Sequence, residues 1–283
     1  MAKINRSAKS GNAWSTDELL AYNITIQMKN DTEFFGREIC SNDYIDPSLL
    51  SSLTSVPTGI SDDARRFLTY LAIISQPNAE DSIFNEFANS LLNALHFDRQ
   101  NTTIIQQLYS LPLTICKHEN RKAHPDICIM TAHPMPMILS LVQRKKPLFR
   151  LNGAEPPLIA GAIAAFQHNN RNRDKLGLTA LDTMIIPCIT VEGTRPLFYK
   201  VPVTKHLSDC VATGRLPEEQ TVVTRCGPPP PLEAHVGMES LDYRRTALRY
   251  YYTFRDLAED CWTPLRVDPE YCWAVFPYKG PVE

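Results

Sequence analysis

Residues 123–146 read AHPDICIMTAHPMPMILSLVQRKK and combine two apolar runs with one turn-rich segment. The runs at 126–130 and 137–142 flank residues 132–136, which include two prolines. Proline between two short apolar runs favours a turn, so this stretch predicts a β-hairpin. Antiparallel pairing then places Asp126 at the end of the sheet where Lys145 and Lys146 close the second strand.

This arrangement resembles the PD-(D/E)XK nuclease superfamily. In that superfamily an Asp on one strand and an acid-x-Lys triplet on the next hold a divalent metal ion, and the Lys orients or activates the attacking water. The acid and the Lys share one face because side chains alternate along a strand, and oxygen ligands suit Mg²⁺. The resemblance implies an α/β fold with a mixed central sheet flanked by helices, and Asp126 as the metal ligand.

The triplet departs from the superfamily pattern in both registers. If Lys146 is the motif lysine, the acid position holds Arg144, and if Lys145 is, it holds Gln143. Neither residue is a carboxylate, and a cation at this position would repel the metal ion. We therefore expect catalysis to be lost rather than kept, with no cofactor unless an acid elsewhere restores a Mg²⁺ site.

Two acids could replace the missing ligand. Glu86 lies in a helix expected over 80–95, and a first-helix acid often points at the metal in this superfamily. Glu155 begins the helix that follows the hairpin, and some superfamily members carry an acid there. Each also has an ordinary explanation, because Glu86 suits a solvated helix surface and Glu155 suits the positive end of the helix dipole.

The whole chain resembles a group of mushroom-type fungal proteins with a PD-(D/E)XK-like core. In that group the hairpin usually ends Val-Gln-Glu-Asp-Lys, which aligns the acid with Arg144 and the lysine with Lys146. The next helix usually offers Gln and Glu where this chain has Pro157 and Gly161. The resemblance thus implies a degenerate site. It extends over the segments AWSTDELLAYNI, EFANSLLNAL, HPDICIM, LVQRKK, EPPLIAGAIAAFQHNNR, MIIPCITVEGTRPLFYKVPVT and YRRTALRYYYTFRDLAEDCW.

Hydrophobic periodicity and capping residues predict the remaining elements. The order of helix, three strands and helix in the middle of the chain matches the superfamily core. We expect residues 1–13 to be a disordered tail, 14–235 an α/β domain, and 236–283 a helix and tail packed on it through Trp262 and Trp273. The other expected elements are helices near 15–18, 60–75, 156–170, 204–212 and 238–261, strands at 23–28 and 108–117, and a hairpin of 182–191 with 195–203.

Composition narrows the class of protein. The chain has 283 residues, 43% of them hydrophobic, and a net charge of −2, so any nucleic-acid surface must be local. Its eight cysteines form no CxxC pair, which favours free buried thiols in a reducing compartment. The first residues lack the apolar core of a signal peptide, and no window approaches the roughly 20 apolar residues of a membrane span. We expect a cytoplasmic or nuclear protein.

Three functions remain open. A nuclease-like protein without cleavage could bind DNA or RNA through a cationic end of the sheet. A Mg²⁺-dependent nuclease could survive with a migrated acid. An interaction module could form a homodimer through the Tyr-rich final helix, although such a stripe also suits core packing. The cationic side chains at this end of the sheet could also be an ordinary solvated surface, and Arg171 and Arg173 could simply cap the end of a helix. The candidate nucleic-acid contacts are Lys117, Arg121, Lys122, Arg144, Lys145, Lys146, Arg150, Arg171 and Arg173.

Overall fold

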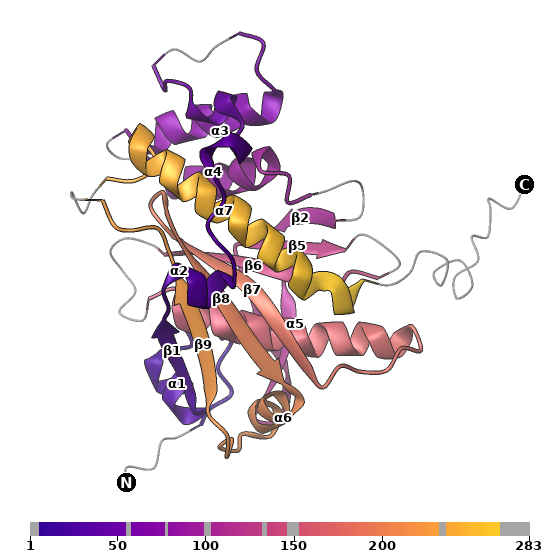
Figure 1. The fold of residues 1–283 in the computed structure, drawn as a ribbon. Coiled ribbons are helices and arrows are strands. Elements are labelled where there is room, and N and C mark those ends of the chain that lie inside the picture. Colours follow the sequence, from indigo (N-terminus) through magenta and orange to yellow (C-terminus); the bar gives the residue numbers. More distant parts are fainter. Residues whose placement is uncertain are drawn as a thin grey trace, which may run out of the picture.

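The computed structural model describes residues 6–54, 58–76, 79–98, 103–131, 135–145, 153–231 and 236–266. Within these residues the chain is an α/β protein: seven strands form a mixed sheet, helices cover both of its faces, and two further strands form a separate hairpin (Figure 1). The predicted α/β class with a mixed central sheet is confirmed.

The main sheet has the strand order β1-β9-β8-β7-β6-β5-β2, and β3 pairs with β4 apart from it. Two pairs, β1 with β9 and β6 with β7, are parallel, and the other pairs are antiparallel. The strands are β1 (Ile24–Met28), β2 (Thr103–Gln107), β3 (Leu111–Ile115), β4 (His118–Ala123), β5 (Ile127–Thr131), β6 (Ile138–Lys145), β7 (Thr183–Glu192), β8 (Arg195–Thr204) and β9 (Thr221–Cys226).

The helices begin where the sequence offers caps. Ser61 accepts the Ala64 N–H, and Thr204 accepts the Leu207 N–H, as hydroxyl N-caps do. The helices are α1 (Thr16–Ala21), α2 (Asp31–Phe35), α3 (Asp62–Ile74), α4 (Asp81–Ala94), α5 (Glu155–Lys175), α6 (Lys205–Thr213) and α7 (Leu241–Trp262), with short 3-10 turns at Gly11–Ala13, Asn42–Tyr44, Pro47–Leu50 and Thr263–Leu265.

The central hairpin is confirmed, but its third partner differs from the prediction. β5 and β6 pair antiparallel, with Ile127 opposite Val142. The strand expected at 108–117 is shorter and belongs to the separate β3–β4 hairpin, while β2, which was not predicted, pairs with β5. Cys116 and Lys117 both have positive φ angles, 49° and 66°, and form the turn that ends β3. Turns of this kind usually carry Asn or Gly, so residue type alone does not indicate a turn here.

Two more elements differ from expectation. The short helix α2 had no prediction, and Gly36 closes it with a φ of 67°. β9, which had no prediction, pairs with both β1 and β8 and so connects the N-terminal strand to the main sheet. The expected hairpin of β7 and β8, the short helix α6 and the long final helix are confirmed.

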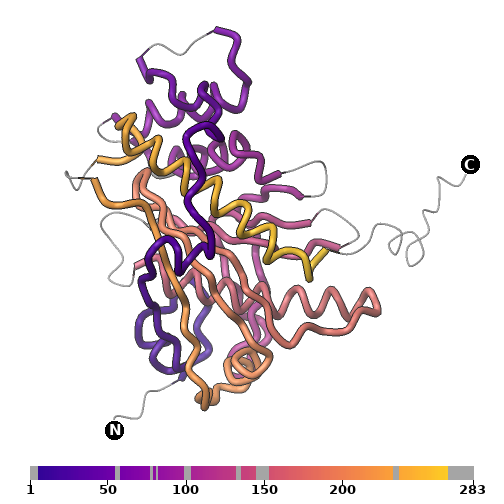
Figure 2. The backbone as a smooth tube through the Cα atoms, in the orientation of Figure 1, coloured from indigo at the N-terminus to yellow at the C-terminus, as the bar shows by residue number. Residues whose placement is uncertain are grey.

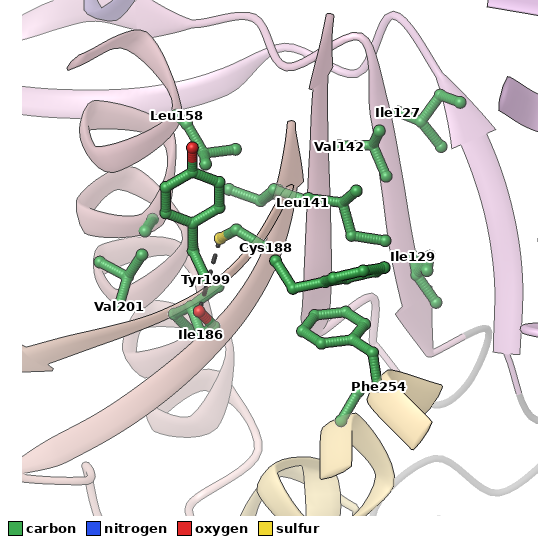
Figure 3. Packing of buried hydrophobic residues seen from close by; sticks show 14 of the residues in the cluster. Ile127, Ile129, Leu141, Val142, Leu158, Ile186, Cys188, Tyr199, Val201 and Phe254 are labelled. Atoms are coloured by element: carbon green, nitrogen blue, oxygen red, sulfur yellow. Dashed lines mark hydrogen bonds between the residues drawn. The ribbon is translucent and has the colours of Figure 1, made fainter. Parts of the chain in front are cut away.

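The two faces of the sheet carry different helices. α5 packs on one face, so closely that a Cβ on Gly161 would lie 3.1 Å from Leu141 Cδ1. α7 crosses the other face, where the Trp262 Nε1–H donates to the Leu139 carbonyl at 3.0 Å. Figure 3 shows this division, with Leu158 on the α5 side and Phe254 on the α7 side. Trp273, expected to pack on the core as well, lies outside the described residues.

The C-terminal helix is joined to the N-terminal half by buried polar contacts. Part of the chain between α2 and α3 runs beside α7 (Figure 2). Arg244, only 2% exposed, donates to the carbonyls of Met238, Leu49 and Ser51. The aromatic stripe of α7 is buried in this chain. That stripe consists of Tyr243, Tyr250, Tyr251, Phe254 and Trp262.

Residues 6–13 lie against the core, contrary to the expectation of disorder for this part of the tail. Arg6 Nε donates to the Ala21 carbonyl at 2.9 Å. Gly11 is buried, and a Cβ there would lie 2.7 Å from the Ala123 Cβ. Asn12 exchanges two hydrogen bonds with the backbone of His124. The low hydrophobicity that suggested disorder is offset by these polar contacts.

Three side-chain amides of α5 each bind both backbone groups of a residue elsewhere. Gln167 accepts the Thr114 N–H at 2.8 Å and donates to its carbonyl at 3.1 Å. Asn169 does the same with Ile138, at 2.7 and 2.8 Å. Asn170 pairs with Leu181 at 2.9 and 3.0 Å. We call these three contacts the amide clamps, and they fix α5 to β3, to the start of β6 and to the segment before β7.

We predict that Asn169→Ala lowers the free energy of unfolding by about 2–4 kcal/mol, because it leaves the Ile138 N–H and carbonyl buried without partners. Asn169 is 0% exposed. Asn170→Ala removes the same two kinds of backbone bond at a half-buried position, where water can replace them, so it should cost less. Urea unfolding with an unchanged m-value measures both. Equal costs for the two variants would contradict the assigned role of burial.

Candidate functional site

Asp126 is held by the second strand of the hairpin. Its Oδ2 accepts a hydrogen bond from Gln143 Nε2 at 2.7 Å and another from the backbone N–H of Arg144 at 2.7 Å. Gln143 is 6% exposed, and Asp126 is half-buried. The carboxylate of Asp126 thus satisfies two donors at the point where the two strands part.

The two faces of β6 separate Gln143 from Arg144. Leu141 and Gln143 lie on the α5 face by strand alternation. Arg144 lies on the other face, with its guanidinium carbon 5.4 Å from the centre of the Phe84 ring of α4. Of the two candidate acid positions, Gln143 therefore lies on the α5 face, and its side chain donates to Asp126.

The candidate lysines are only partly described. Lys145 ends β6 opposite Glu192 of β7, and alternation assigns its position to the face of Gln143. The side chain of Lys145, together with Lys146 and Arg150, lies outside the described residues. If Gln143 occupies the acid position of the triplet, the motif lysine is Lys145.

Glu155 belongs to a second polar cluster on the α5 face. It is the first residue of α5, and its Oε1 accepts the Tyr199 hydroxyl at 2.9 Å and forms an ion pair with Arg225. Thr190 Oγ1 lies 3.2 Å from the Tyr199 hydroxyl oxygen. Burial, and then the nearby charge of Glu155, raises the pKa of Tyr199, so the phenol stays protonated and donates.

The strand register brings the two clusters close together. Gln143 of β6 is the Cα partner of Thr190 of β7, and Tyr199 of β8 is the partner of Arg225 of β9. A polar row therefore crosses four strands, from Asp126 and Gln143 to Glu155 and Arg225, beneath the N-terminal end of α5. We call it the polar row. Sequence reasoning missed Thr190, Tyr199 and Arg225, because strand β9 and its register were not visible in the sequence.

The polar row does not resemble a metal centre. Within the described ranges, no three His, Cys, Asp or Glu residues are grouped so that they could hold a metal ion. Glu155 is neutralised by Arg225, and Glu86 belongs to α4, on the face opposite Gln143. Gln143 presents a donor to Asp126 where a metal ion would need an oxygen ligand. These residues therefore fit poorly to Mg²⁺.

Among the described candidate nucleic-acid contacts, several lie at a distance from Asp126 and Glu155. Lys117 lies beside α6, where its N–H donates to the Ala212 carbonyl. Arg171 and Arg173 donate to the carbonyls of Pro112, Thr179 and Pro264, at the end of α5 that is about 24 Å from Glu155. These two arginines bind carbonyl groups near the C-terminal end of α5, in line with the helix-capping role that was the alternative to nucleic-acid contact.

Two further cations lie on β4, in the strand that leads to Asp126. Lys122 is exposed and Arg121 is half-buried. Lys122 is opposite Pro112 of β3, the residue whose carbonyl accepts from Arg171, so the register places Lys122 beside the Arg171 contact.

Comparisons with known proteins give no assignment. The chain matches no model of a known protein family, and no curated protein has a matching sequence. In the part of the chain that the structure describes, the helices are too short or too polar to span a membrane.

We predict that Asp126→Ala lowers the free energy of unfolding by about 1–3 kcal/mol, because the buried Gln143 amide and the Arg144 N–H lose their acceptor. Asp126→Asn keeps one acceptor oxygen and should cost less. Thermal unfolding with and without EDTA checks this prediction. A wild-type protein that EDTA destabilises as strongly as the mutation does would instead show that Asp126 holds a metal ion.

Proposed function

We propose that this chain is a degenerate PD-(D/E)XK nuclease-like protein that binds nucleic acid without cleaving it. The order of elements supports the fold part of the proposal. α4, β2, β5, β6 and α5 follow one another as helix, three antiparallel strands and helix, with the β3–β4 hairpin inserted after β2. β7 then pairs parallel to β6.

One observation carries the loss of cleavage. In the superfamily the Asp and the triplet acid face a shared metal ion, whereas here the Gln143 amide donates directly to Asp126 at 2.7 Å. The amide has one neutral oxygen in place of a charged carboxylate, and one carboxylate alone holds Mg²⁺ weakly. Glu155, the acid that could have replaced it, is paired with Arg225. The alternative of an active nuclease with a migrated acid is therefore less well supported.

The nucleic-acid part of the proposal rests on Lys122, on the strand that leads to Asp126, and on Lys145, at the end of β6. Lys122 is exposed on β4, and Lys145 ends β6 on the same side of the hairpin as Gln143. Exposed lysines contact phosphates as point charges, and the chain's net charge of −2 makes the binding local and salt-sensitive. The proposal of an interaction module keeps less support, since the aromatic stripe of α7 is buried.

We predict that Lys122→Ala combined with Lys145→Ala weakens binding to DNA or RNA and reduces the slope of log affinity against log salt by about 1 for each phosphate that is no longer neutralised. Lys117→Asn is the matched control: it removes a cation at the far end of the sheet, and Asn tolerates the positive φ of this position. Fluorescence anisotropy over a salt series measures both. Equal effects of the control and the double variant would remove the proposed surface, and absence of any binding would remove nucleic acid as the ligand.

A second prediction tests the register and the lost metal site together. Gln143→Glu should lower the free energy of unfolding by about 1–3 kcal/mol without metal, because it places a second carboxylate against Asp126. Mn²⁺ should reverse this loss, by about 2.7 kcal/mol at a hundredfold excess over Kd. Arg144→Glu, on the opposite face, should show no Mn²⁺-dependent gain.

The same variants distinguish the two nuclease hypotheses. Wild-type protein should not cleave single- or double-stranded DNA or RNA with Mg²⁺ or Mn²⁺. Cleavage by the wild type that is abolished by Glu155→Gln would establish a migrated acid and overturn the proposal. A Mn²⁺ response of Arg144→Glu instead of Gln143→Glu would place the motif lysine at Lys146.

A further inference from the structure

One edge of the main sheet is open among the strands that the structure describes. β2 ends the strand order and pairs with β5 alone. Residues 103–108 read TIIQQL and contain no charge and no proline, the residues that usually protect a free edge. Ile104 is 41% exposed and Leu108 is 71% exposed. This edge can accept a further strand.

A shallow hollow of about 410 Å³ adjoins this edge. Its described lining is Asn93 and Asp98, from the end of α4 and the turn after it, with Thr103, Ile104 and Ile105 of β2. Backbone groups of an edge strand beside a pocket for side chains are the two parts of strand-addition sites, where the main chain gives affinity and the pocket gives selectivity.

The described chain ends near this edge. Trp262, the last residue of α7, donates to the Leu139 carbonyl and to Ser140 Oγ. Ser140 is opposite Ile129 of β5, which is opposite Ile105 of β2. The ring of Trp262 therefore lies over β6, two strand spacings or about 10 Å from the free edge. The described chain continues from there to Arg266, whose N–H donates to the Trp262 carbonyl at 3.2 Å, and the Pro264 carbonyl accepts from Arg173 at the end of α5.

The sequence that follows suits this edge. Residues 271–276 read YCWAVF, an uncharged run of aromatic and β-forming residues between Pro269 and Pro277. The prolines limit the length of a strand, because they cannot donate to a ladder. The four residues 267–270 span about 13 Å when extended, a length similar to the two strand spacings between β6 and the free edge.

We propose that residues 271–276 of this chain add to the free edge of β2 as a further strand and that Trp273 fills the hollow beside Ile104. The strand satisfies the outward N–H and carbonyl groups of β2, and the aromatic ring covers the exposed isoleucine. The occupant is the chain itself because its end is tethered within reach, which gives it a high effective concentration at the edge.

Hydrogen exchange tests this proposal directly. Amides of 103–107 should exchange at least tenfold more slowly in the full chain than in a chain ending at Arg266, and a peptide of residues 267–283 added to the shortened chain should restore the protection. The same rate in both chains would overturn the proposal. Protection that rises with protein concentration, together with a dimer in sedimentation, would assign the edge to a second copy and would also overturn it.

Point variants keep the test independent of the truncation. Trp14 and Trp262 are buried, at 0% and 2% exposure, so Trp273 is the tryptophan whose quenching reports on the tail. Ile104→Asp should expose Trp273 to acrylamide and release the β2 amides. Ile185→Asp is the matched control, since Ile185 is similarly exposed, at 44%, but lies on β7 away from the hollow. Equal quenching in both variants would reject the hollow as the site of Trp273.

Discussion

The amide clamps of α5 place the helix and the strands in one arrangement. Each of Gln167, Asn169 and Asn170 provides one donor and one acceptor, the same pair that a neighbouring strand would provide. A buried backbone group without a partner costs about 1–3 kcal/mol, so sliding α5 by one residue would break six hydrogen bonds at once. Apolar packing of the Ala-rich helix alone would tolerate such a slide, because small side chains define register weakly. The clamps therefore determine which residues meet at the other end of α5.

That other end is where the polar row lies. With Asn169 fixed on Ile138 and Gly161 against Leu141, the chain direction of β6 brings Gln143 beneath the start of α5. Glu155 then reaches Tyr199 and Arg225 across β8 and β9. The candidate site is thus positioned from about 20 Å away by amides that contact none of its residues.

Part of this arrangement could be predicted from the sequence. Each element that could not be predicted has its own physical reason. The hairpin of β5 and β6 could be predicted because two apolar runs flank a proline turn, and Asp126 beside its end followed from antiparallel pairing. β9 could not, because TVVTRC is short and its partners are distant in sequence. The role of Gln167–Asn170 could not either, since a polar run at a helix end usually faces solvent. The position of Lys117 beside α6 follows from a turn at positive φ that only the structure reveals.

The pairing of Gln143 with Asp126 can be compared with the pair of acids that the proposed function assigns to an active nuclease. Two carboxylates facing each other in a half-buried site repel unless a metal ion neutralises them. The Gln143 amide instead donates a hydrogen bond to Asp126. The ion pair of Glu155 with Arg225 satisfies the second carboxylate in the same way. Each of the two acids, Asp126 and Glu155, binds a protein donor, so the presence of Asp126 in this chain requires no catalytic role.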